Sequence, residues 1–231
     1  MRSEANYNTI PVGQLGIIAL PGCEELANKI DNYLIRWRFQ RNSEHKDTLA
    51  FAGYEKSTYL INMDFPRFGT GEGKAALNQT VRGYDIYILC DVFNYGVTYK
   101  MYGMTVPMSP DEHFANLKRA ISAIEGKAKR VSVIMPMLYE GRQHKRSSRE
   151  SLDCAMMLQE LHNMGVENFI TFDAHDPRVM NAIPLCGFES ISPAYQIIKA
   201  AVNNVDNLKI NKDNIMIISP DEGGMSRCIY Y

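Results

Sequence analysis

Short apolar segments that alternate with helical patterns constrain the fold of this chain more than any other feature. Residues 16–20, 85–90 and 131–135 are compact runs of apolar and β-branched side chains, and each is followed, directly or after a connection, by a helical pattern. Repeated strand and helix alternation produces parallel sheets with helices packed on both faces. The sequence therefore predicts an α/β protein built on a parallel sheet.

The remaining segments extend this alternation. Further strands are expected at residues 59–63, 169–172 and 215–218, and helices at residues 26–34, 109–126, 152–165 and 194–202. In the first helix, Leu26, Ile30 and Leu34 recur every four residues and are expected on its buried face. Ser109, Pro110 and Glu112 form a capping-box pattern that predicts where the second helix begins.

Composition places the chain among ordinary globular proteins. It has 231 residues, of which 45% are hydrophobic and 22% charged, enough for one large domain or two small ones. We expect a cytoplasmic protein without a membrane segment, because no apolar run is long enough to span a bilayer and no export signal is visible. The five cysteines are widely spaced without a CxxC pair, which favours reduced thiols over disulfides or a zinc site.

A formal net charge of −1 predicts no general attraction to nucleic acid or to acidic membranes. One segment is an exception, since residues 141–149 (GRQHKRSSR) carry four fixed cations. Such a cluster suits a polyphosphate ligand. A solvated basic loop is the alternative interpretation, and charge alone favours it.

A polar strand exit occurs at residues 166–177, which read VENFITFDAHDP. Ligands of open parallel sheets bind beyond the carboxyl ends of the strands. Asp173 and His175 are two residues apart and would point the same way in an extended chain. The pair could hold a divalent metal or shuttle a proton, or could equally be a helix-capping aspartate and a hydrogen-bonded loop histidine.

Two glycine-containing loops follow other predicted strands. Residues 64–74 contain three glycines in five positions, which brings backbone close to a neighbour but matches neither a Walker loop nor a dinucleotide fingerprint. Residues 219–224 read SPDEGG and form a second strand exit with acidic residues.

Five motifs in this order resemble the ribose-phosphate pyrophosphokinase family over roughly residues 14–227. They are RFGTGE at residues 67–72, VRG at 81–83, GRQH at 141–144, DAH at 173–175 and SPDEGG at 219–224. The resemblance implies transfer of diphosphate from ATP to the 1-hydroxyl of ribose 5-phosphate with Mg²⁺, by a homo-oligomer. It also implies two phosphoribosyltransferase-like domains, the first at residues 1–182 and the start of a second at residues 183–231.

The resemblance further implies roles for particular residues. An adenine site, often offered to a neighbouring subunit, would comprise Phe68, Thr70, Gly71 and Glu72. Other ATP contacts would come from Arg142 and Gln143. Metal would be held by His175 and Asp221, with Asp173 beside them, although Mg²⁺ prefers oxygen ligands to imidazole. Arg227 aligns with a basic position of the family and would meet phosphate during catalysis, although a single arginine there is more often a surface charge.

Two substitutions depart from the family pattern. Thr70 replaces the usual Asp or Asn, and His144 replaces the Asp that follows Arg-Gln. They motivate a second hypothesis, a non-catalytic regulatory homologue that binds nucleotide and assembles with an active synthetase. The family's later loop for ribose phosphate has no counterpart here, so we expect that this polypeptide cannot complete catalysis alone.

Overall fold

The computed structural model describes residues 11–229, apart from residues 44–55, 207, 209–210 and 212–214. It divides into two compact units, Met1–Ser190 and Ile191–Tyr231. The domain boundary expected after residue 182 stays a prediction. No helix in the described part of the chain is long and apolar enough to cross a membrane.

The first unit alternates strands with helices, as the sequence predicts. Its helices are α1 (Glu24–Ser43), α2 (Pro110–Ile124), α3 (Asp153–Asn163) and the 3-10 helix η2 (Pro177–Ala182). Its strands are β1 (Gln14–Ala19), β2 (Met63–Asp64), β3 (Ala76–Leu77), β4 (Tyr84–Leu89), β5 (Thr98–Met101), β6 (Met104–Pro107), β7 (Arg130–Met135), β8 (Asn168–Phe172) and β9 (Gly187–Ile191).

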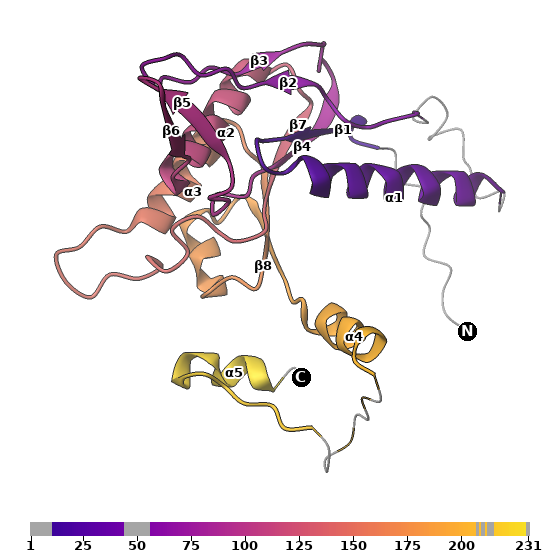
Figure 1. Ribbon diagram of the computed structural model, residues 1–231, viewed down its shortest axis with the longest axis vertical. Coiled ribbons are helices and arrows are strands. Elements are labelled where there is room, and N and C mark those ends of the chain that lie inside the picture. The colour runs from indigo at the N-terminus through magenta and orange to yellow at the C-terminus, as the bar shows by residue number, and fades with distance from the viewer. Residues whose placement is uncertain (1–10, 44–55, 207, 209–210, 212–214, 230–231) are drawn as a thin grey trace. The chain divides into compact units, whose positions relative to one another are not determined.

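Five of these strands form the central sheet in the order β1-β4-β7-β8-β9 (Figure 1). The pairs β1 with β4, β4 with β7 and β7 with β8 are parallel. In the last of these pairs, Ser132 lies opposite Asn168 and Met135 opposite Thr171. The carboxyl ends of β7 and β8 therefore lie at the same edge of the sheet.

Alternate side chains of the strands enter two cores on opposite faces of the sheet. On one face, Ile18, Ile88 and Val133 pack in a core that also contains the buried residues of α2 and α3. On the other face, Ile17 and Leu89 pack in a core that also contains buried residues of α1. Because successive strand residues point to opposite faces, helices on both sides are needed to cover these apolar strands.

The helices agree with the predicted ones, with one correction. The Ser109 hydroxyl accepts a hydrogen bond from the Glu112 N–H, and the Glu112 carboxylate accepts one from the Ser109 N–H, which completes the predicted capping box of α2. In α1, however, Leu26 is exposed, whereas Ala27 is buried together with Cys23, the residue immediately before the helix. The buried stripe of α1 is thus displaced by one position from the four-residue pattern.

The strand predicted at residues 59–63 is mostly wrong. Only β2 is a strand there, paired antiparallel with β3. Ile17 accepts a hydrogen bond from the Ile61 N–H and donates its own N–H to Tyr59, both at 2.8 Å, so the segment adds an isolated parallel bridge beside β1. After this bridge the chain turns away from β1 towards β2. Residues 59–62 therefore make too few consecutive hydrogen bonds to β1 to form a strand.

The second unit contains α4 (Ala194–Asn204), η3 (Glu222–Gly224) and α5 (Met225–Cys228). The helix predicted at residues 194–202 is confirmed by α4. The strand predicted at residues 215–218 is wrong, because this segment is irregular. Met216 and Ile218 are 81% and 75% exposed, so no described neighbour buries these side chains, and no described strand pairs with the segment.

Candidate functional site

The loop after β7 and the loop after β8 leave the sheet at the same edge, and they meet there. His144 belongs to the first loop, and its ring centroid lies 4.9 Å from that of His175 in the second. Its Nε2 atom lies 3.6 Å from Oδ2 of Asp176. The predicted GRQH and DAH motifs, about thirty positions apart in the sequence, are therefore in direct contact.

Asp176 is the charged centre of this contact. Its carboxylate accepts hydrogen bonds from both the side chain and the backbone N–H of Arg178. These bonds hold the pKa of Asp176 well below its ordinary value, against a smaller opposing effect of desolvation, and the charges of Arg178 and His144 lower it further. Asp176 is therefore an ionised carboxylate next to the His144 ring.

The beginning of the loop after β7 is fixed by packing against α2. Leu138 is buried, and the ring of Tyr139 stacks on Phe114 with centroids 4.6 Å apart. The Gln143 N–H donates to the Glu140 carbonyl at 2.8 Å, which turns the chain immediately before the basic residues. The turn places Arg142 and Gln143 directly before His144.

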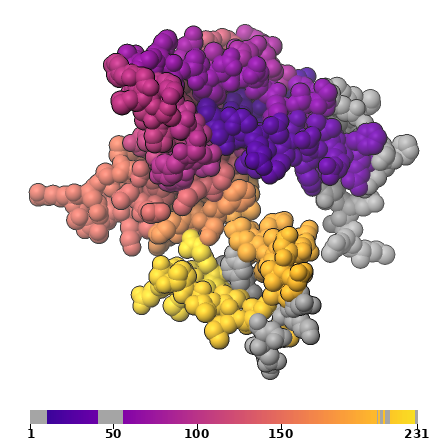
Figure 2. All heavy atoms as spheres, viewed as in Figure 1, coloured from indigo at the N-terminus to yellow at the C-terminus, as the bar shows by residue number. Residues whose placement is uncertain are grey.

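Beyond this turn the loop is exposed. Figure 2 shows the segment near residue 150, in salmon, projecting from the first unit. The four fixed cations of the segment are all exposed, namely Arg142, Lys145, Arg146 and Arg149. Exposed guanidinium and ammonium groups next to a strand exit suit a multiply charged phosphate ligand.

The residues after β8 have a constrained backbone. Asp173 has φ of 45°, a left-handed conformation that non-glycine residues rarely adopt. The neighbouring Ala174 N–H donates to Oγ of Ser190 at 2.9 Å. Asp173 and His175 are both exposed, so the strand exit presents a carboxylate and an imidazole at the surface.

The RFGTGE segment forms a small hairpin of its own. Phe68 N–H donates to the Glu72 carbonyl and Gly71 N–H to the Phe68 carbonyl, at 2.8 and 2.9 Å. The Thr70 hydroxyl donates to the Glu72 carboxylate at 2.9 Å. Of the four predicted adenine-site residues, Phe68, Thr70 and Glu72 are exposed and Gly71 is partly buried. The structure gathers all four in one loop between β2 and β3.

The RFGTGE loop at residues 67–72 and the basic segment at residues 141–149 lie in different parts of the first unit. In Figure 1, β2 and β3 lie at the top, whereas the long loop before α3 projects to the left below them. The residues predicted to contact ATP therefore form two separate groups within one chain.

Asp221 and Arg227 belong to the second unit. The Asp221 carboxylate caps η3, since its Oδ1 accepts from the Gly224 N–H at 2.8 Å. Arg227 lies in α5, and both residues are described only within this unit.

No group of three or more His, Cys, Asp or Glu side chains in the described part of the chain is placed to hold a metal ion. Mg²⁺ is commonly bound by one or two carboxylates together with substrate phosphates and water. The exposed carboxylate of Asp173 fits such a role, whereas the imidazole of His175 is a poor ligand for this hard cation. The donor set fits an ion held mainly by a phosphate ligand.

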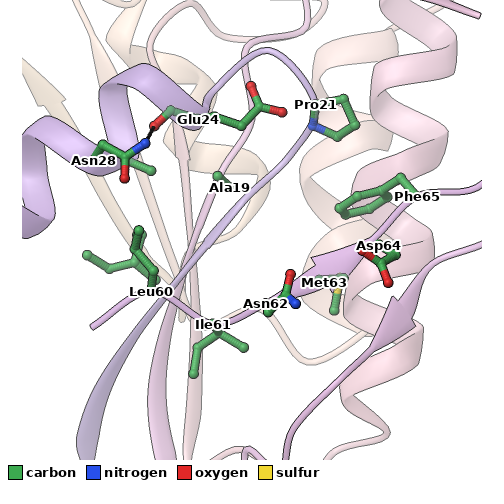
Figure 3. A pocket seen from close by; sticks show the side chains of 12 residues that line it. Ala19, Pro21, Glu24, Asn28, Leu60, Ile61, Asn62, Met63, Asp64 and Phe65 are labelled. Atoms are coloured by element: carbon green, nitrogen blue, oxygen red, sulfur yellow. Dashed lines mark hydrogen bonds between the residues drawn. The ribbon is translucent and has the colours of Figure 1, made fainter. Parts of the chain in front are cut away.

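A pocket of about 440 Å³ lies elsewhere, between β1, the first turns of α1 and residues 60–65 (Figure 3). Leu60, Met63 and Phe65 contribute apolar surface, and Glu24 and Asp64 contribute carboxylates. None of the predicted site residues lines it, and neither does any described lysine, arginine or histidine. The pocket therefore does not suit a phosphate.

Sequence analysis missed the hairpin of β5 and β6. It contacts the RFGTGE loop, because the Tyr102 N–H donates to the Gly69 carbonyl at 2.9 Å. Only Gly103 of the Tyr102-Gly103 pair is a usual residue of a two-residue hairpin turn, so the sequence carried only half of the expected turn signal.

A parallel sheet covered on both faces, with polar loops at the carboxyl ends of its strands, defines an α/β protein. Its similarity to a solved phosphoribosylpyrophosphate synthetase assigns the phosphoribosyltransferase-like fold. Residues 15–165 match the family model described as the N-terminal domain of ribose phosphate pyrophosphokinase. The chain belongs to the ribose-phosphate pyrophosphokinase family.

Individual relatives agree. The ribose-phosphate pyrophosphokinase of Oceanobacillus iheyensis is 25% identical over 172 residues, which cover 74% of this chain and 48% of that protein. The one from Corynebacterium ammoniagenes is 26% identical over 163 residues, which cover 70% and 45%. The crystal structure of phosphoribosylpyrophosphate synthetase from Mycobacterium smegmatis superimposes with a TM-score of 0.58 at 16% identity, covering 83% of this chain and 52% of that one. The chain thus spans about half the length of these relatives.

Proposed function

We propose that this chain supplies the ATP-binding part of a ribose-phosphate diphosphokinase, which converts ATP and ribose 5-phosphate into phosphoribosyl pyrophosphate and AMP. The observation that carries the proposal is the contact of His144 with His175 and Asp176. The contact brings the GRQH loop and the DAH exit to one edge of the parallel sheet, so that the first loop's cations and the second loop's carboxylates belong to neighbouring segments. A nucleoside triphosphate with its cation requires this arrangement.

The proposed reaction is a displacement at the β-phosphorus of ATP. The 1-hydroxyl oxygen of ribose 5-phosphate forms a bond to this phosphorus and loses its proton to solvent. The bond between the β-phosphorus and the oxygen bridging it to the α-phosphate breaks, and AMP leaves with that oxygen. Such transfers depend on positioning and charge neutralisation more than on covalent help from the protein.

In this proposal, Arg142 and Gln143 bind the phosphates, and Phe68, Thr70, Gly71 and Glu72 bind adenine. Within the first unit, His175 is a proposed Mg²⁺ contact with Asp173 beside it. Within the second unit, taken by itself, Asp221 is a proposed metal contact and Arg227 a proposed phosphate contact. When bound, Mg²⁺ would supply further neutralisation of the phosphates. Because the two groups of ATP contacts lie apart in one chain (Figure 1), we propose that two chains of a homo-oligomer complete each site.

The test is calorimetric titration with a non-hydrolysable ATP analogue, with and without Mg²⁺. We expect Mg²⁺-dependent binding that weakens about 10- to 150-fold in Arg142→Ala, the range for losing a hydrogen bond to a charged group. Lys129→Ala is the matched control, since it removes an exposed cation immediately before β7, at the opposite end of this strand. Equal weakening in both variants, or no binding by the unmodified chain, would refute the proposal.

A non-catalytic regulatory role is the second candidate. It is favoured by His144, which occupies the position of a family acid and contacts Asp176. This candidate predicts Mg²⁺-dependent nucleotide binding without AMP production. Because this polypeptide alone is not expected to complete catalysis, the assay measures AMP from ATP and ribose 5-phosphate after the family's C-terminal region with the ribose phosphate loop is joined to it. AMP formation above background then excludes the regulatory role alone, and nucleotide binding without AMP formation supports it.

A further inference from the structure

The tip of the β5–β6 hairpin has an unusual residue in its turn. Met101 pairs with Met104, which leaves Tyr102 and Gly103 as a two-residue turn. Their φ angles are 49° and 81°, so both adopt left-handed conformations. Turns of this kind favour Asn, Asp or Gly at the first position, and a bulky side chain there is strained.

No packing explains this strain. The Tyr102 side chain is 75% exposed and therefore does not gain the burial that would offset an unfavourable backbone conformation. Strained residues persist at ligand-binding sites, where a particular side chain is required at a particular place. The position of Tyr102 relative to other loops then indicates what the ring could contact.

The hairpin tip is held against the RFGTGE loop. Tyr102 donates its N–H to the Gly69 carbonyl at 2.9 Å. Gly71 approaches so closely that a Cβ there would lie 2.8 Å from Sδ of Met101. The φ of Gly71 is 93°, a backbone conformation that favours glycine, so the loop reaches the Met101 side chain through a turn that glycine permits. The two loops therefore lie against each other.

Arg67 also links the RFGTGE loop to the β5–β6 hairpin. Its Nη1 donates to the Gly71 carbonyl at 2.9 Å, and its guanidinium lies 4.6 Å from the ring centroid of Tyr99 in β5. Within this joined surface, Phe68 is 56% exposed and belongs to the loop that the Tyr102 backbone contacts. The tip thus presents two exposed aromatic side chains on two loops tied by a hydrogen bond.

We infer that Tyr102 recognises the purine base of the nucleotide together with Phe68. Flat aromatic faces bind bases by stacking and discriminate little between phosphate chains. The inference rests on the proposed function, since it adds a base-recognising residue to the adenine part of the same site. It explains why a tyrosine occupies a turn position at which asparagine is more stable.

The experiment compares ATP with inorganic tripolyphosphate as calorimetric ligands, both with Mg²⁺, for the unmodified chain, Tyr102→Asn and Tyr102→Phe. We expect Tyr102→Asn to weaken ATP binding about 5- to 150-fold and to leave tripolyphosphate binding unchanged. Tyr102→Phe keeps the ring and should bind ATP as the unmodified chain does. The melting temperature of Tyr102→Asn should be equal or higher, because asparagine tolerates the left-handed turn.

Each other outcome has a definite meaning. If Tyr102→Asn binds ATP normally, or loses tripolyphosphate equally, the inference is overturned. If the unmodified chain binds ATP no more tightly than tripolyphosphate while Arg142→Ala weakens the binding of both, base recognition fails but the proposed phosphate site stands. If the unmodified chain binds neither ligand, the proposed function and the inference both fail.

Discussion

At the scale of single residues, Asp31 of α1 illustrates how a buried charge is accommodated. Its side chain accepts hydrogen bonds from the Thr58 hydroxyl at 2.8 Å and from the Tyr59 N–H at 2.7 Å. The residue is only 6% exposed, and a buried carboxylate is tolerated when such donors satisfy it. Asp31 therefore fastens the segment beside β1 to the first helix.

Asp31→Ala should lower the free energy of unfolding by about 1–3 kcal/mol, because it leaves the buried Tyr59 N–H without its partner. Thr58→Val removes the other donor while the backbone bond remains, and should cost less, about 0.5–1.5 kcal/mol. Urea denaturation followed by circular dichroism measures both. An Asp31→Ala cost no larger than that of Thr58→Val would contradict this account.

At the scale of elements, Glu112 joins the β5–β6 hairpin to the start of α2. Besides completing the capping box, it accepts a hydrogen bond from the Tyr99 hydroxyl and lies 3.5 Å from Nη1 of Arg67. Desolvation opposes its ionisation, but the hydrogen bonds from Tyr99 and Ser109 and the charge of Arg67 together lower its pKa below the ordinary 4.5. One carboxylate thus couples a local helix signal to a tertiary contact.

This coupling predicts a pH dependence. A carboxyl whose pKa is lower in the folded state stabilises the fold above its unfolded value, and that stabilisation disappears as the pH falls through the folded value. The difference in unfolding free energy between the unmodified chain and Glu112→Gln should therefore be constant between about pH 6 and 7 and shrink below about pH 4.5. Tyr99→Phe should reduce this dependence. Denaturation at several pH values is the measurement, and a difference that grows on acidification would contradict it.

At the scale of the whole molecule, the two groups of proposed ATP contacts lie in different parts of one compact unit (Figure 1). If each site takes one group from each of two chains, then two different defective chains can complement each other. The variant Phe68→Ala keeps the basic segment at residues 141–149 but lacks part of the proposed adenine site at residues 67–72. The variant Arg142→Ala keeps the proposed adenine site but lacks a cation of the basic segment.

Each variant alone should bind the ATP analogue weakly, whereas an equal mixture, dissociated and reassembled, should regain about a quarter of the sites of a dimer, as random pairing requires. Calorimetry of the mixture measures this fraction. The double variant Phe68→Ala with Arg142→Ala, mixed with the unmodified chain, is the control for exchange. A mixture that binds no better than its components would mean that the site lies within one chain.

Much of the fold was predictable because its signals are local. Continuous apolar runs at residues 85–90 and 131–135 predicted the central strands, and Ser109 with Glu112 predicted the start of α2. Predictions failed where a distant partner was needed, as at residues 59–63, which leave β1 after one bridge, and at residues 215–218, which are irregular. A strand requires a neighbour, and the neighbour is not encoded in the strand itself.

The sequence by itself determined the family, the alternation of strands and helices, and the motifs that carry the proposed chemistry, since all of these depend on residues close together in the chain. Only the tertiary structure decided which motifs meet. His144 contacts Asp176 because parallel pairing of β7 with β8 brings both loops to one edge. Tyr102 donates its N–H to the Gly69 carbonyl because the β5–β6 hairpin folds against a loop more than thirty residues earlier in the chain, a contact that no local pattern specifies.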